Sequence, residues 1–530
     1  MSPDMRALRV SIIVPVYNGA NYMRDAIDSA LAQTWPNTEI IVVNDGSNDA
    51  GETDRIARSY GERIKYISKP NGGVASALNA GIEAMTGDVF CWLSHDDRHL
   101  PEKTARQVEH WESLGRPDAV LISDYRLINE TGETITDVRL DHELLTKKPS
   151  YALLRGCIHG CSVFVPRALF DRVGNFDINL PTTQDYDLWF RSFRTFPFVH
   201  MADVLIESRW HDEQGSKKID HTIEATRFWM RVINGITPAE KVKWEGSEAA
   251  FLVGMSKFLG ENKLVEAASE AKRRVKTVID GVLVSVVIPL FDRVDMAVSA
   301  IESVKEQTHR RIEIIVVDDG CKEDLSGVRA ALAGHPNARL ISQRNAGPAA
   351  ARNNGWRAAK GDYVAFLDAD DLFLPTKISE QLIAMAGAGA AFSHTSYARA
   401  RHGDITLQES GSANAFPDII GSCSVATPTV MVARSLIDEG FSFPEHIRIG
   451  EDVVLWLHIA SAHGIMGISR ALTIVRADDS STAFDKSKQI TGVENILADV
   501  CASDELYQHK EHVIQLKKLA SRLRGEQEDT

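Results

Sequence analysis

Short apolar runs alternate with segments of helical pattern through about the first ninety residues of the chain. Four runs have the length and the bounding turn residues of buried strands: 10–16, 39–43, 63–68 and 88–93. The segments between them space their apolar residues as on one face of a helix: 21–33, 50–60 and 73–85. Strands that alternate with helices form a parallel sheet covered by helices on both faces. The pattern therefore predicts an α/β fold.

The same series of elements returns in the second half of the chain. Residues 10–18 reappear as residues 284–292, and Pro15 and Pro289 are 274 positions apart (289 − 15). Three further segments return at the same spacing: 39–46, 71–73 and 94–97. One register that holds without a gap over about ninety residues indicates a duplication. The chain is therefore expected to hold two copies of one domain.

Two segments have no counterpart in the repeat. Residues 237–280 place apolar residues at helical spacing and contain few Gly, Pro or Ser, so we expect a helical connector packed on both domains. Residues 487–530 are also predicted to be helical, with an apolar face surrounded by basic residues. The expected organisation is two domains, a connector and a tail: 1–236, 281–486, 237–280 and 487–530.

The apolar face of the predicted tail helix holds Val513, Leu516, Ala520 and Leu523. Such a face can pack within the protein or in a dimer. A basic amphipathic helix can instead touch an anionic membrane surface. The sequence leaves both roles open.

Length and charge narrow the function classes. A chain of 530 residues is expected to form about two to four domains. A net charge of −14 excludes a general nucleic-acid-binding protein, because no basic excess is available to neutralise phosphates. Six cysteines without zinc-ligand spacing fit free thiols in a reducing cytoplasm. Neither a bilayer-spanning run nor a signal peptide is evident, so we expect a cytoplasmic protein, either free or peripheral at the inner membrane.

An acidic cluster follows the fourth strand of each copy. In the second copy, residues 361–367 form an apolar strand that leads into Asp368, Asp370 and Asp371. Open α/β sheets bind ligands at the carboxyl ends of their strands, and carboxylates suit Mg²⁺ or Mn²⁺ held together with substrate phosphates. The first copy has Ser94 in place of the first acid. We therefore expect a site for a divalent cation and a diphosphate in each copy.

With these motifs in this order, the chain resembles family 2 glycosyltransferases of the GT-A fold twice over, in residues 8–230 and 282–484. The resemblance rests on the Pro-x-Tyr/Phe strand end, the Asp-Gly turn, the Asn-x-Gly loop, the Asp-x-Asp motif and a late Glu/Gln-Asp pair before an aromatic-rich helix. It implies two Rossmann-like nucleotide-diphospho-sugar transferase domains in tandem. Three later segments of each copy are expected to add the acceptor-side half, in the first copy near 119–124, 160–165 and 185–196.

The resemblance also implies a nucleotide site in each copy. Asp45 and Asp319 are expected to contact the nucleobase, and a carboxylate can accept the hydrogen bond that a uracil-type N3–H donates. Asn71 and Asn345 lie in glycine-bearing loops, where they either approach the nucleotide or only shape the turn. The other predicted nucleotide-binding residues form the wall behind the base or face ribose and diphosphate: Pro15, Tyr17, Ser94, Pro289, Phe291, Arg352 and Asp368. For the prolines, a role in the core is the alternative, and Asp368 can also be a metal ligand.

The resemblance makes Asp96 and Asp370 the ligands of a divalent cation, Mn²⁺ or Mg²⁺, with one ion in each domain. Such an ion stabilises the negative charge that develops on the departing diphosphate. Residues 209–211, Arg-Trp-His, resemble the Arg-x-His segment of the family, whose His reaches the metal or the diphosphate. This points to His211 in the first copy and to its counterpart Asp478 in the second. A surface residue without a ligand role is the alternative for both.

A Glu/Gln-Asp pair precedes an aromatic-rich helix in each copy, as Gln184-Asp185 and Glu451-Asp452. A helix N-terminus stabilises a carboxylate there, so Asp185 and Asp452 are predicted to be the general bases that take the proton of the acceptor hydroxyl. A simple N-cap role is the alternative. Direct attack by the acceptor inverts the anomeric centre, as the family does. Two tryptophans four residues on are expected in the core: Trp189 and Trp456.

The leading prediction is a bifunctional enzyme that adds sugars from nucleotide-sugar donors, UDP-linked in at least one copy, to a glycan or a lipid-linked glycan. The resemblance to two-domain capsule, lipopolysaccharide and glycosaminoglycan-type synthases suggests a bacterial surface glycan. The alternative is one active domain beside a degenerate one that binds glycan or acts as a scaffold. The first copy is then the suspect, because it has Leu78, Ser94 and Gln184 where the second has Arg352, Asp368 and Glu451. A sugar nucleotidyltransferase is a remote third option, since neither copy opens with a glycine-rich basic loop.

Overall fold

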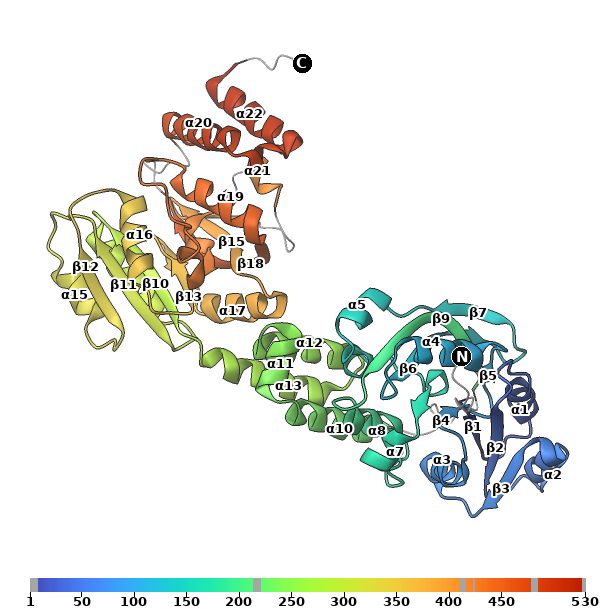
Figure 1. Ribbon diagram of the computed structural model, residues 1–530. Coiled ribbons are helices and arrows are strands. Elements are labelled where there is room, and N and C mark those ends of the chain that lie inside the picture. The colour runs from blue at the N-terminus through green and yellow to red at the C-terminus, as the bar shows by residue number, and fades with distance from the viewer. Residues whose placement is uncertain (1–7, 213–220, 410–415, 423–424, 478–484, 527–530) are drawn as a thin grey trace. The chain divides into compact units, whose positions relative to one another are not determined.

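The computed structural model describes residues 8–212, 221–409, 416–422, 425–477 and 485–526 (Figure 1). The chain forms two compact units. The first comprises the residues up to Ile236 together with Lys257–Ala268, and the second comprises Thr237–Ser256 and the residues from Ser269 onward. Each unit contains one copy of the repeat, as the duplication predicts.

The first unit is built on a mostly parallel sheet. Its strands, in the order in which they pair, are β3 (Lys65–Lys69), β2 (Thr38–Asp45), β1 (Val10–Val16), β4 (Val89–Trp92) and β8 (Val165–Pro166). Only β8 runs antiparallel to its neighbour among these described strands. The helices between the parallel strands are α1 (Met23–Leu31), α2 (Glu52–Arg58) and α3 (Gly73–Ala84). The predicted strands and helices are confirmed, with ends displaced by a few residues.

The alternation of side chains along β1 explains how helices cover both faces of this sheet. Val10, Ile12 and Val14 point to one face and share a buried cluster with residues of α1 and α2. Ile13 points to the other face, where a Cβ atom on Gly81 of α3 would lie 2.4 Å from Ile13 Cγ2. A glycine at this position therefore lets α3 lie directly on the sheet.

A second sheet completes the first unit. Its strands pair in the order β5 (Arg98–His99), β9 (Phe198–Arg209), β6 (Val120–Ile128) and β7 (Thr134–Val138). The neighbouring helices are α4 (Lys103–Ser113), α5 (His142–Lys147), α6 (Tyr151–Leu154), α7 (Ala168–Val173) and α8 (Gln184–Ser192). Strand β9 ends at Arg209, so this sheet carries the Arg-x-His segment towards the first sheet.

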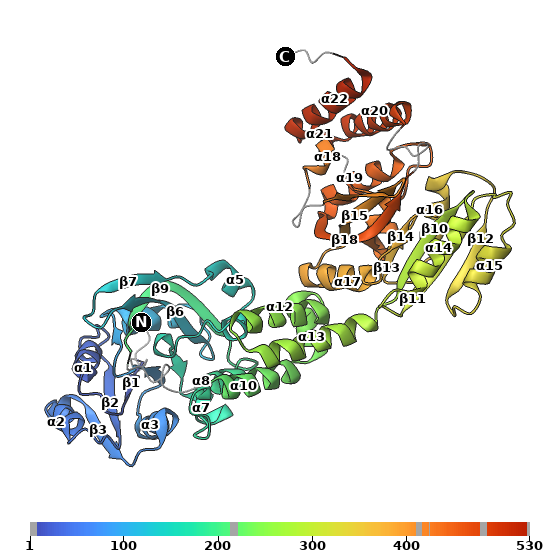
Figure 2. The same ribbon diagram turned by 180° about the vertical axis from the view of Figure 1, so that it is seen from behind.

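The second unit repeats this plan in one continuous mixed sheet, seen from the other side in Figure 2. Its described strands pair in the order β12 (Ala338–Ser342), β11 (Ile312–Asp318), β10 (Val284–Leu290), β13 (Tyr363–Phe366), β17 (Met431–Ala433), β15 (Phe392–Arg401), β18 (Met466–Arg476) and β14 (Leu372–Phe373), with β16 (Asp404–Gln408) beside β15. In the first unit the corresponding link between the sheets is a single bridge, Leu121 to Phe164.

The helices that belong to the second copy of the repeat occupy the positions expected from the first. They are α14 (Val294–Lys305), α15 (Ser326–Leu332), α16 (Pro348–Ala358), α17 (Lys377–Ala388), α18 (Ile419–Ser422) and α19 (Glu451–His463). Gly355 of α16 repeats the close approach of Gly81, because its Cβ would lie 2.3 Å from Val287 Cγ1. Trp189 and Trp456 are fully buried, which confirms their predicted place in the core.

The segment without a counterpart upstream is helical. After α10 (Thr222–Gly235), it forms α11 (Pro238–Glu245), α12 (Glu248–Glu261) and α13 (Val265–Asp280). The apolar residues at helical spacing in this segment are buried: Phe251, Met255, Leu259, Leu264, Ala268, Ala271, Val275 and Ile279. The helical character of the segment is confirmed, and its packing on both domains stays a prediction.

The tail packs onto the second unit as α20 (Lys486–Ala502), α21 (Asp504–Tyr507) and α22 (Lys510–Arg524). Val513, Leu516 and Ala520 are buried in the same apolar cluster as Trp456, and Leu523 packs against it. The apolar face that could have entered a membrane is therefore used inside the protein. Across the described part of the chain, helices fall short of the length and apolar character needed to cross a bilayer.

Candidate active sites

The predicted site residues of the first unit follow the carboxyl ends of β1, β2 and β4, at one edge of the sheet. Pro15 is buried within β1, Tyr17 is exposed just beyond it, and Asp45 is the last residue of β2. Ser94 and Asp96 lie in the turn after β4. The loops after β1 and β4 touch, because a Cβ atom on Gly19 would lie 2.7 Å from the His95 ring. This edge is where open α/β sheets bind their ligands.

Asp45 holds the Asn-x-Gly loop in place. Its carboxylate accepts hydrogen bonds from the Gly73 amide at 2.7 Å, the Gly72 amide at 3.1 Å and Lys69 Nζ at 2.6 Å. The Asn71 side chain donates to the Asp45 carbonyl at 2.9 Å. Asn71 therefore shapes the loop, and any nucleobase contact of Asp45 has to use its remaining acceptor capacity.

Asp319 does the same in the second unit. Its carboxylate accepts from the Ala346 and Gly347 amides at 2.7 and 2.8 Å and from Gln343 Nε2 at 2.9 Å. Asn345 stays exposed in this loop. The matched bonds show that the duplication preserved the geometry of the loop along with its sequence.

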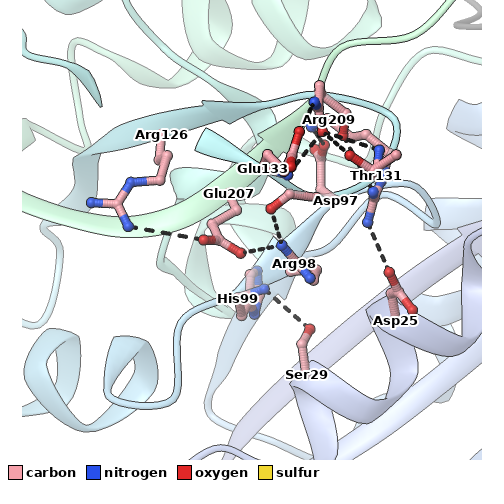
Figure 3. Close-up of polar contacts among 12 residues, drawn as sticks. Asp25, Ser29, Asp97, Arg98, His99, Arg126, Thr131, Glu133, Glu207 and Arg209 are labelled. Atoms are coloured by element: carbon pink, nitrogen blue, oxygen red, sulfur yellow. Dashed lines mark hydrogen bonds and ion pairs between the residues drawn. The ribbon is translucent and has the colours of Figure 1, made fainter. Parts of the chain in front are cut away.

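Arg209 fastens the acidic turn of the first unit from the end of β9. Its backbone N–H donates to Asp97 Oδ1 at 2.9 Å, and its Nε donates to the Asp96 carbonyl at 3.0 Å. Nη2 reaches Asp25 of α1 at 2.9 Å, and the guanidinium lies 4.5 Å from the centre of the Tyr22 ring. Figure 3 shows Arg209 between Asp97 and Asp25. The buried Arg209 thus ties together the acidic turn, the second sheet and α1.

Arg209 engages the backbone carbonyl of Asp96, and the Asp96 side chain contacts His211. Asp96 Oδ2 and His211 Nε2 are 3.0 Å apart, and the His211 ring lies 5.0 Å from the Tyr22 ring. The structure thus brings together the two residues predicted as metal ligands in the first unit. Burial lowers the pKa of the neighbouring His95, whose imidazole is therefore neutral near pH 7.

The second unit fastens its acidic turn in the same way. The Arg476 N–H donates to Asp371 Oδ1 at 2.8 Å, and Arg476 Nε donates to the Asp370 carbonyl. The Asp370 carboxylate, however, forms an ion pair with Arg293. Burial and the neighbouring Asp368 raise the pKa of Asp370, against the effect of that guanidinium. Asp478, the second predicted ligand, lies outside the described residues.

In the second unit an ion triad lies beside this turn, with Arg352 and Glu451 buried and Asp368 partly exposed. Arg352 contacts Asp368 at 2.7 Å and Glu451 at 2.9 Å. Burial would lower the pKa of Arg352, but the two carboxylates raise it above its usual range. Burial and the adjacent Asp452 raise the pKa of Glu451 to about 7. The first unit replaces all three members together with uncharged residues: Leu78, Ser94 and Gln184.

The two predicted general bases stand in the first turns of α8 and α19. Asp185 Oδ1 accepts from the Tyr186 amide at 2.8 Å, and burial raises the pKa of Asp185 to about 6. Asp452 accepts from the Val453 amide at 2.9 Å and also from Thr427 Oγ1 at 2.6 Å. The backbone bond is the same in both units, whereas the hydroxyl donor belongs to the second.

In the second unit these residues surround one cavity of about 1070 Å³. The cavity is lined by all the predicted site residues that the structure describes in this unit: Pro289, Phe291, Asp319, Asn345, Arg352, Asp368, Asp370 and Asp452. Its volume slightly exceeds that of typical small-molecule sites, which is about 300–1,000 Å³. The cavity is therefore large enough for a nucleotide sugar with part of an acceptor.

In the first unit, contacts through one segment connect the acidic turn with the start of α8. Cys161 Sγ lies 3.3 Å from Ser94 Oγ and 3.1 Å from Asp97 Oδ2. Three residues earlier, the Ile158 amide donates to Tyr186 Oη at 3.1 Å, next to Asp185. The segment from Ile158 to Cys161 therefore contacts the acidic turn at one end and, at the other, Tyr186, the residue that follows the predicted base.

Sequence reasoning missed a buried group beneath this turn. The ligand atoms of Asp97, His159 and Cys161 lie within 4.8 Å of one another. Burial raises the pKa of Asp97 to about 7, raises that of the Cys161 thiol well above its usual range and lowers that of His159 to about 4. Near neutral pH the His159 imidazole and the Cys161 thiol are thus uncharged, and Cys161 supports the turn through its contacts with Ser94 and Asp97. The sequence alone does not reveal the group, because Asp97 lies far along the chain from His159 and Cys161.

Arg293 was also missed. The signal was present in the repeat, since the ungapped alignment places Arg293 opposite Gly19 and Ala369 opposite His95. Neither exchange indicates a role by itself. Only the ion pair with Asp370 connects Arg293 with the acidic motif.

Tandem parallel sheets whose strand ends carry these acidic motifs define a nucleotide-sugar-dependent transferase of GT-A type. The chain matches the model of Glycosyl transferase family 2 over residues 11–172 and 285–410, more than half of its length. The chain belongs to this family and is a glycosyltransferase, which confirms the resemblance seen in both copies.

Relatives support this assignment. An uncharacterized glycosyltransferase of Rickettsia conorii is 45% identical over 501 residues, which cover 93% of this chain and 83% of that protein. The Escherichia coli UDP-Glc:alpha-D-GlcNAc-diphosphoundecaprenol beta-1,3-glucosyltransferase WfaP is 32% identical over 228 residues, 41% of this chain and 86% of WfaP. The chondroitin synthase of Pasteurella multocida is 29% identical over 221 residues, 41% of this chain and 22% of the synthase.

Proposed function

We propose that the chain is a bifunctional inverting glycosyltransferase in which each unit transfers one sugar from its own nucleotide-diphosphate donor to a growing bacterial surface glycan. The observation that carries this proposal is the matched geometry of the two units. Each has a loop-holding Asp at the end of its second strand, an Asp-Asp turn fastened by an arginine, and an Asp in the first turn of a helix. WfaP, whose name gives a UDP-sugar donor and a lipid-diphosphate-linked acceptor, supports UDP as the first nucleotide to test and a lipid-linked glycan as the first acceptor.

Donor binding would use the strand ends. Asp45 and Asp319 would accept the hydrogen bond of the base N–H. The wall behind the base would consist of Pro15 with Tyr17 in the first unit and Pro289 with Phe291 in the second. The aromatic residue is about half exposed in both units, at 45% for Tyr17 and 50% for Phe291. Exposed rings of this kind are available for stacking.

The divalent cation typical of the family fits the first unit. A six-coordinate Mg²⁺ holds its ligands at about 2.0–2.1 Å, so neighbouring ligand atoms lie about 3 Å apart. Asp96 Oδ2 and His211 Nε2 have this separation, at 3.0 Å. A bound ion would supply charge neutralisation at the departing diphosphate. In the second unit a guanidinium already lies on Asp370, so the residues present fit an ion less well.

Asp185 and Asp452 would act as the general bases. Each would accept the proton of the acceptor hydroxyl while that oxygen attacks the anomeric carbon and the nucleoside diphosphate leaves from the opposite face. The proton ends on the carboxylate, the glycosidic bond replaces the bond to phosphate, and the configuration inverts. A pKa of about 6 for Asp185 suits this role, because a base works best with a pKa near the working pH.

Activity in both units is favoured over a degenerate first unit. The three differences that made the first copy suspect correspond, in the second, to Arg352 and the two carboxylates that it contacts. Loss of a single member would leave an unpaired buried charge, whereas replacement of the whole set leaves none. Coordinated exchange is the pattern of a site adapted to another donor or acceptor.

Separate inactivation of the two bases tests the proposal. The purified full-length chain is supplied with a panel of sugar nucleotides, Mn²⁺ and lipid-linked or oligosaccharide acceptors, and products are analysed by mass spectrometry. Asp185→Asn should abolish one transfer and Asp452→Asn the other, each by at least about a hundredfold. Asp171→Asn, at an exposed site on α7, is the matched control. Retention of every transfer in Asp185→Asn would leave one active unit, and no transfer by the wild type would overturn the proposal.

A further inference from the structure

The second unit carries an arginine against its acidic turn where the first unit has a glycine. Arg293 corresponds to Gly19 at the 274-residue shift, and its guanidinium forms an ion pair with Asp370 Oδ2. In the first unit the counterpart Asp96 contacts the imidazole of His211 instead. The corresponding carboxylate therefore faces a guanidinium in the second unit and an imidazole in the first.

A second exchange makes room for this arginine. At Gly19, a Cβ atom would lie 2.6 Å from Val16 Cγ1 and 2.7 Å from His95 Cδ2, closer than any side chain tolerates. The counterpart of His95 is Ala369, which removes that obstacle in the second unit. Gly19 with His95 and Arg293 with Ala369 are thus two compatible pairs. A change of one member of a pair without the other is unfavourable.

The backbone at Arg293 is also unusual. Arg293 has φ 62° and ψ 43° at the start of α14, in the left-handed region that residues other than glycine avoid. Its amide donates to Glu323 Oε1 at 3.2 Å. Such conformations persist where the surrounding structure holds them, and they concentrate at functional sites. The strained backbone therefore agrees with a role for the side chain that it directs towards Asp370.

Arg293 and Asp370 line the same cavity as Asp319 and Asn345. A guanidinium presents a planar fork of N–H donors that matches phosphate oxygens. A metal ion at Asp370 would first have to displace this charge-assisted ion pair. We propose that Arg293 takes over the charge-neutralising role of the divalent cation in the second unit, binding the donor diphosphate directly, so that the first unit alone requires a metal.

This inference rests on the proposed function and separates the two sites by their metal requirement. The full-length chain is saturated with UDP, and bound Mn²⁺ is counted by electron paramagnetic resonance. UDP binding is measured by calorimetry in Mn²⁺ and in EDTA, with GDP, CDP and dTDP as further probes. The wild type should bind one Mn²⁺ per chain, Asp96→Ala almost none, and Asp370→Ala still one.

Nucleotide binding in EDTA should then depend on Arg293. One site per chain should persist without metal in the wild type, and Arg293→Gly, which introduces the residue of the first unit, should weaken that site by at least about tenfold. The nucleotide affinity of Arg293→Lys in EDTA should lie between those of the wild type and Arg293→Gly, because an ammonium keeps the charge but lacks the planar pair of donors. Arg293→Gln, of similar size and uncharged, carries the test if thermal unfolding shows that the glycine variant is unstable.

Two results would overturn the inference alone: two Mn²⁺ ions per wild-type chain with nucleotide bound, or unchanged nucleotide binding in EDTA for both Arg293→Gly and Arg293→Gln. Absence of binding of every nucleotide at both sites, even with Mn²⁺, would overturn the proposed function together with it.

Discussion

At the turn after the fourth strand, the first unit places Asp96 against His211, whereas the second places Asp370 against Arg293. The backbone hydrogen bonds that fasten the two acidic turns are the same. Asp97 and Asp371 each accept the N–H of the arginine that ends the last long strand, and that arginine also holds the carbonyl of the preceding residue. The comparison teaches that Asp97 and Asp371 hold the turn, while the preceding acids, Asp96 and Asp370, take different partners.

The differences between the units are grouped by contact. Arg293 goes with Ala369, and Arg352 goes with its two carboxylate partners, Asp368 and Glu451. Charged residues were gained or lost as sets because an unpaired buried charge is costly. The parallel strands and the arginine-fastened turn are common to both units, and the residues predicted to face the donor differ around them.

Breaking the triad of the second unit should have the largest effect. Arg352→Leu leaves Asp368 and Glu451 without their buried partner, so we expect a loss of about 3–5 kcal/mol in the free energy of unfolding of that unit. The rate of sugar transfer by the second unit (the second transfer) should fall at least about a hundredfold in the same variant. Denaturant unfolding and product analysis measure the two effects. Arg357→Leu, at an exposed site on the same helix, is the control and should change stability by less than about 0.5 kcal/mol.

Transplanting the whole set sharpens this result. The triple variant Arg352→Leu, Asp368→Ser, Glu451→Gln copies the first unit and should recover stability to within about 1 kcal/mol of the wild type. Additive losses in the triple variant would contradict a set that changed together.

The shared close approach of helix and sheet should respond equally in both units. Gly81→Ala and Gly355→Ala place a methyl group 2.4 and 2.3 Å from a β-branched core side chain. Overpacking of about 1–3 kcal/mol should outweigh the gain of up to about 1 kcal/mol in helix propensity. Thermal unfolding of each variant measures the net loss.

Gly327→Ala in α15 is the matched control for both variants. Its Cβ would make only an ordinary 3.5 Å contact with Val298, so this change should be neutral or stabilising. A clear loss in one unit and none in the other would mean that the two helices do not lie on their sheets in the same way.

The pH dependence of the first unit should follow Asp185. A base must be deprotonated to act, so the first transfer should be constant above a pH of about 6 and fall about tenfold per pH unit below it. The measurement is kcat/KM for that transfer against pH, with Asp185→Glu as a comparison. A profile flat down to pH 4.5 would remove Asp185 as the base.

The Asp185 carboxylate should also lower the stability of the protein at neutral pH. Burial raises its pKa from 3.8 to about 6, so the folded state binds the proton more tightly than the unfolded state, and stability declines as pH rises between these values. At pH 7.5, Asp185→Asn should therefore unfold with a free energy about 1–2 kcal/mol higher than the wild type. The gain should vanish near pH 3.5, where Asp185 is protonated in both states.

The smallest effect is expected at the hydroxyl that only the second base receives. Thr427→Val removes the donor to Asp452 Oδ2 and should lower the second transfer by about three- to tenfold without changing the first. The later segments of the two copies are 267 residues apart (452 − 185), so the counterpart of Thr427 is Gly160. A larger residue at Gly160 is excluded by packing, because a Cβ atom there would lie 2.7 Å from the Trp92 ring. Equal loss of both transfers in Thr427→Val would indicate a general structural effect.

Much of the molecule was predictable from the chain alone. The duplication, the parallel strands and the order of helices follow from hydrophobic periodicity, which is a local property of the sequence. The position of the candidate site residues Asp45 and Asp319 at strand ends was also predictable, because the carboxyl ends of parallel strands meet at one edge of a sheet.

The tertiary structure alone decided which partners those residues have. Arg293 reaches Asp370 across 77 residues and Arg352 reaches Glu451 across 99, and no local pattern records such distances. It likewise decided that the apolar face of α22 packs on the second unit, a choice that an amphipathic pattern leaves open. Hydrophobic periodicity indicates which side of a helix or strand is buried. The pairing of charged side chains depends instead on their length, their burial and which distant segment the fold places next to them.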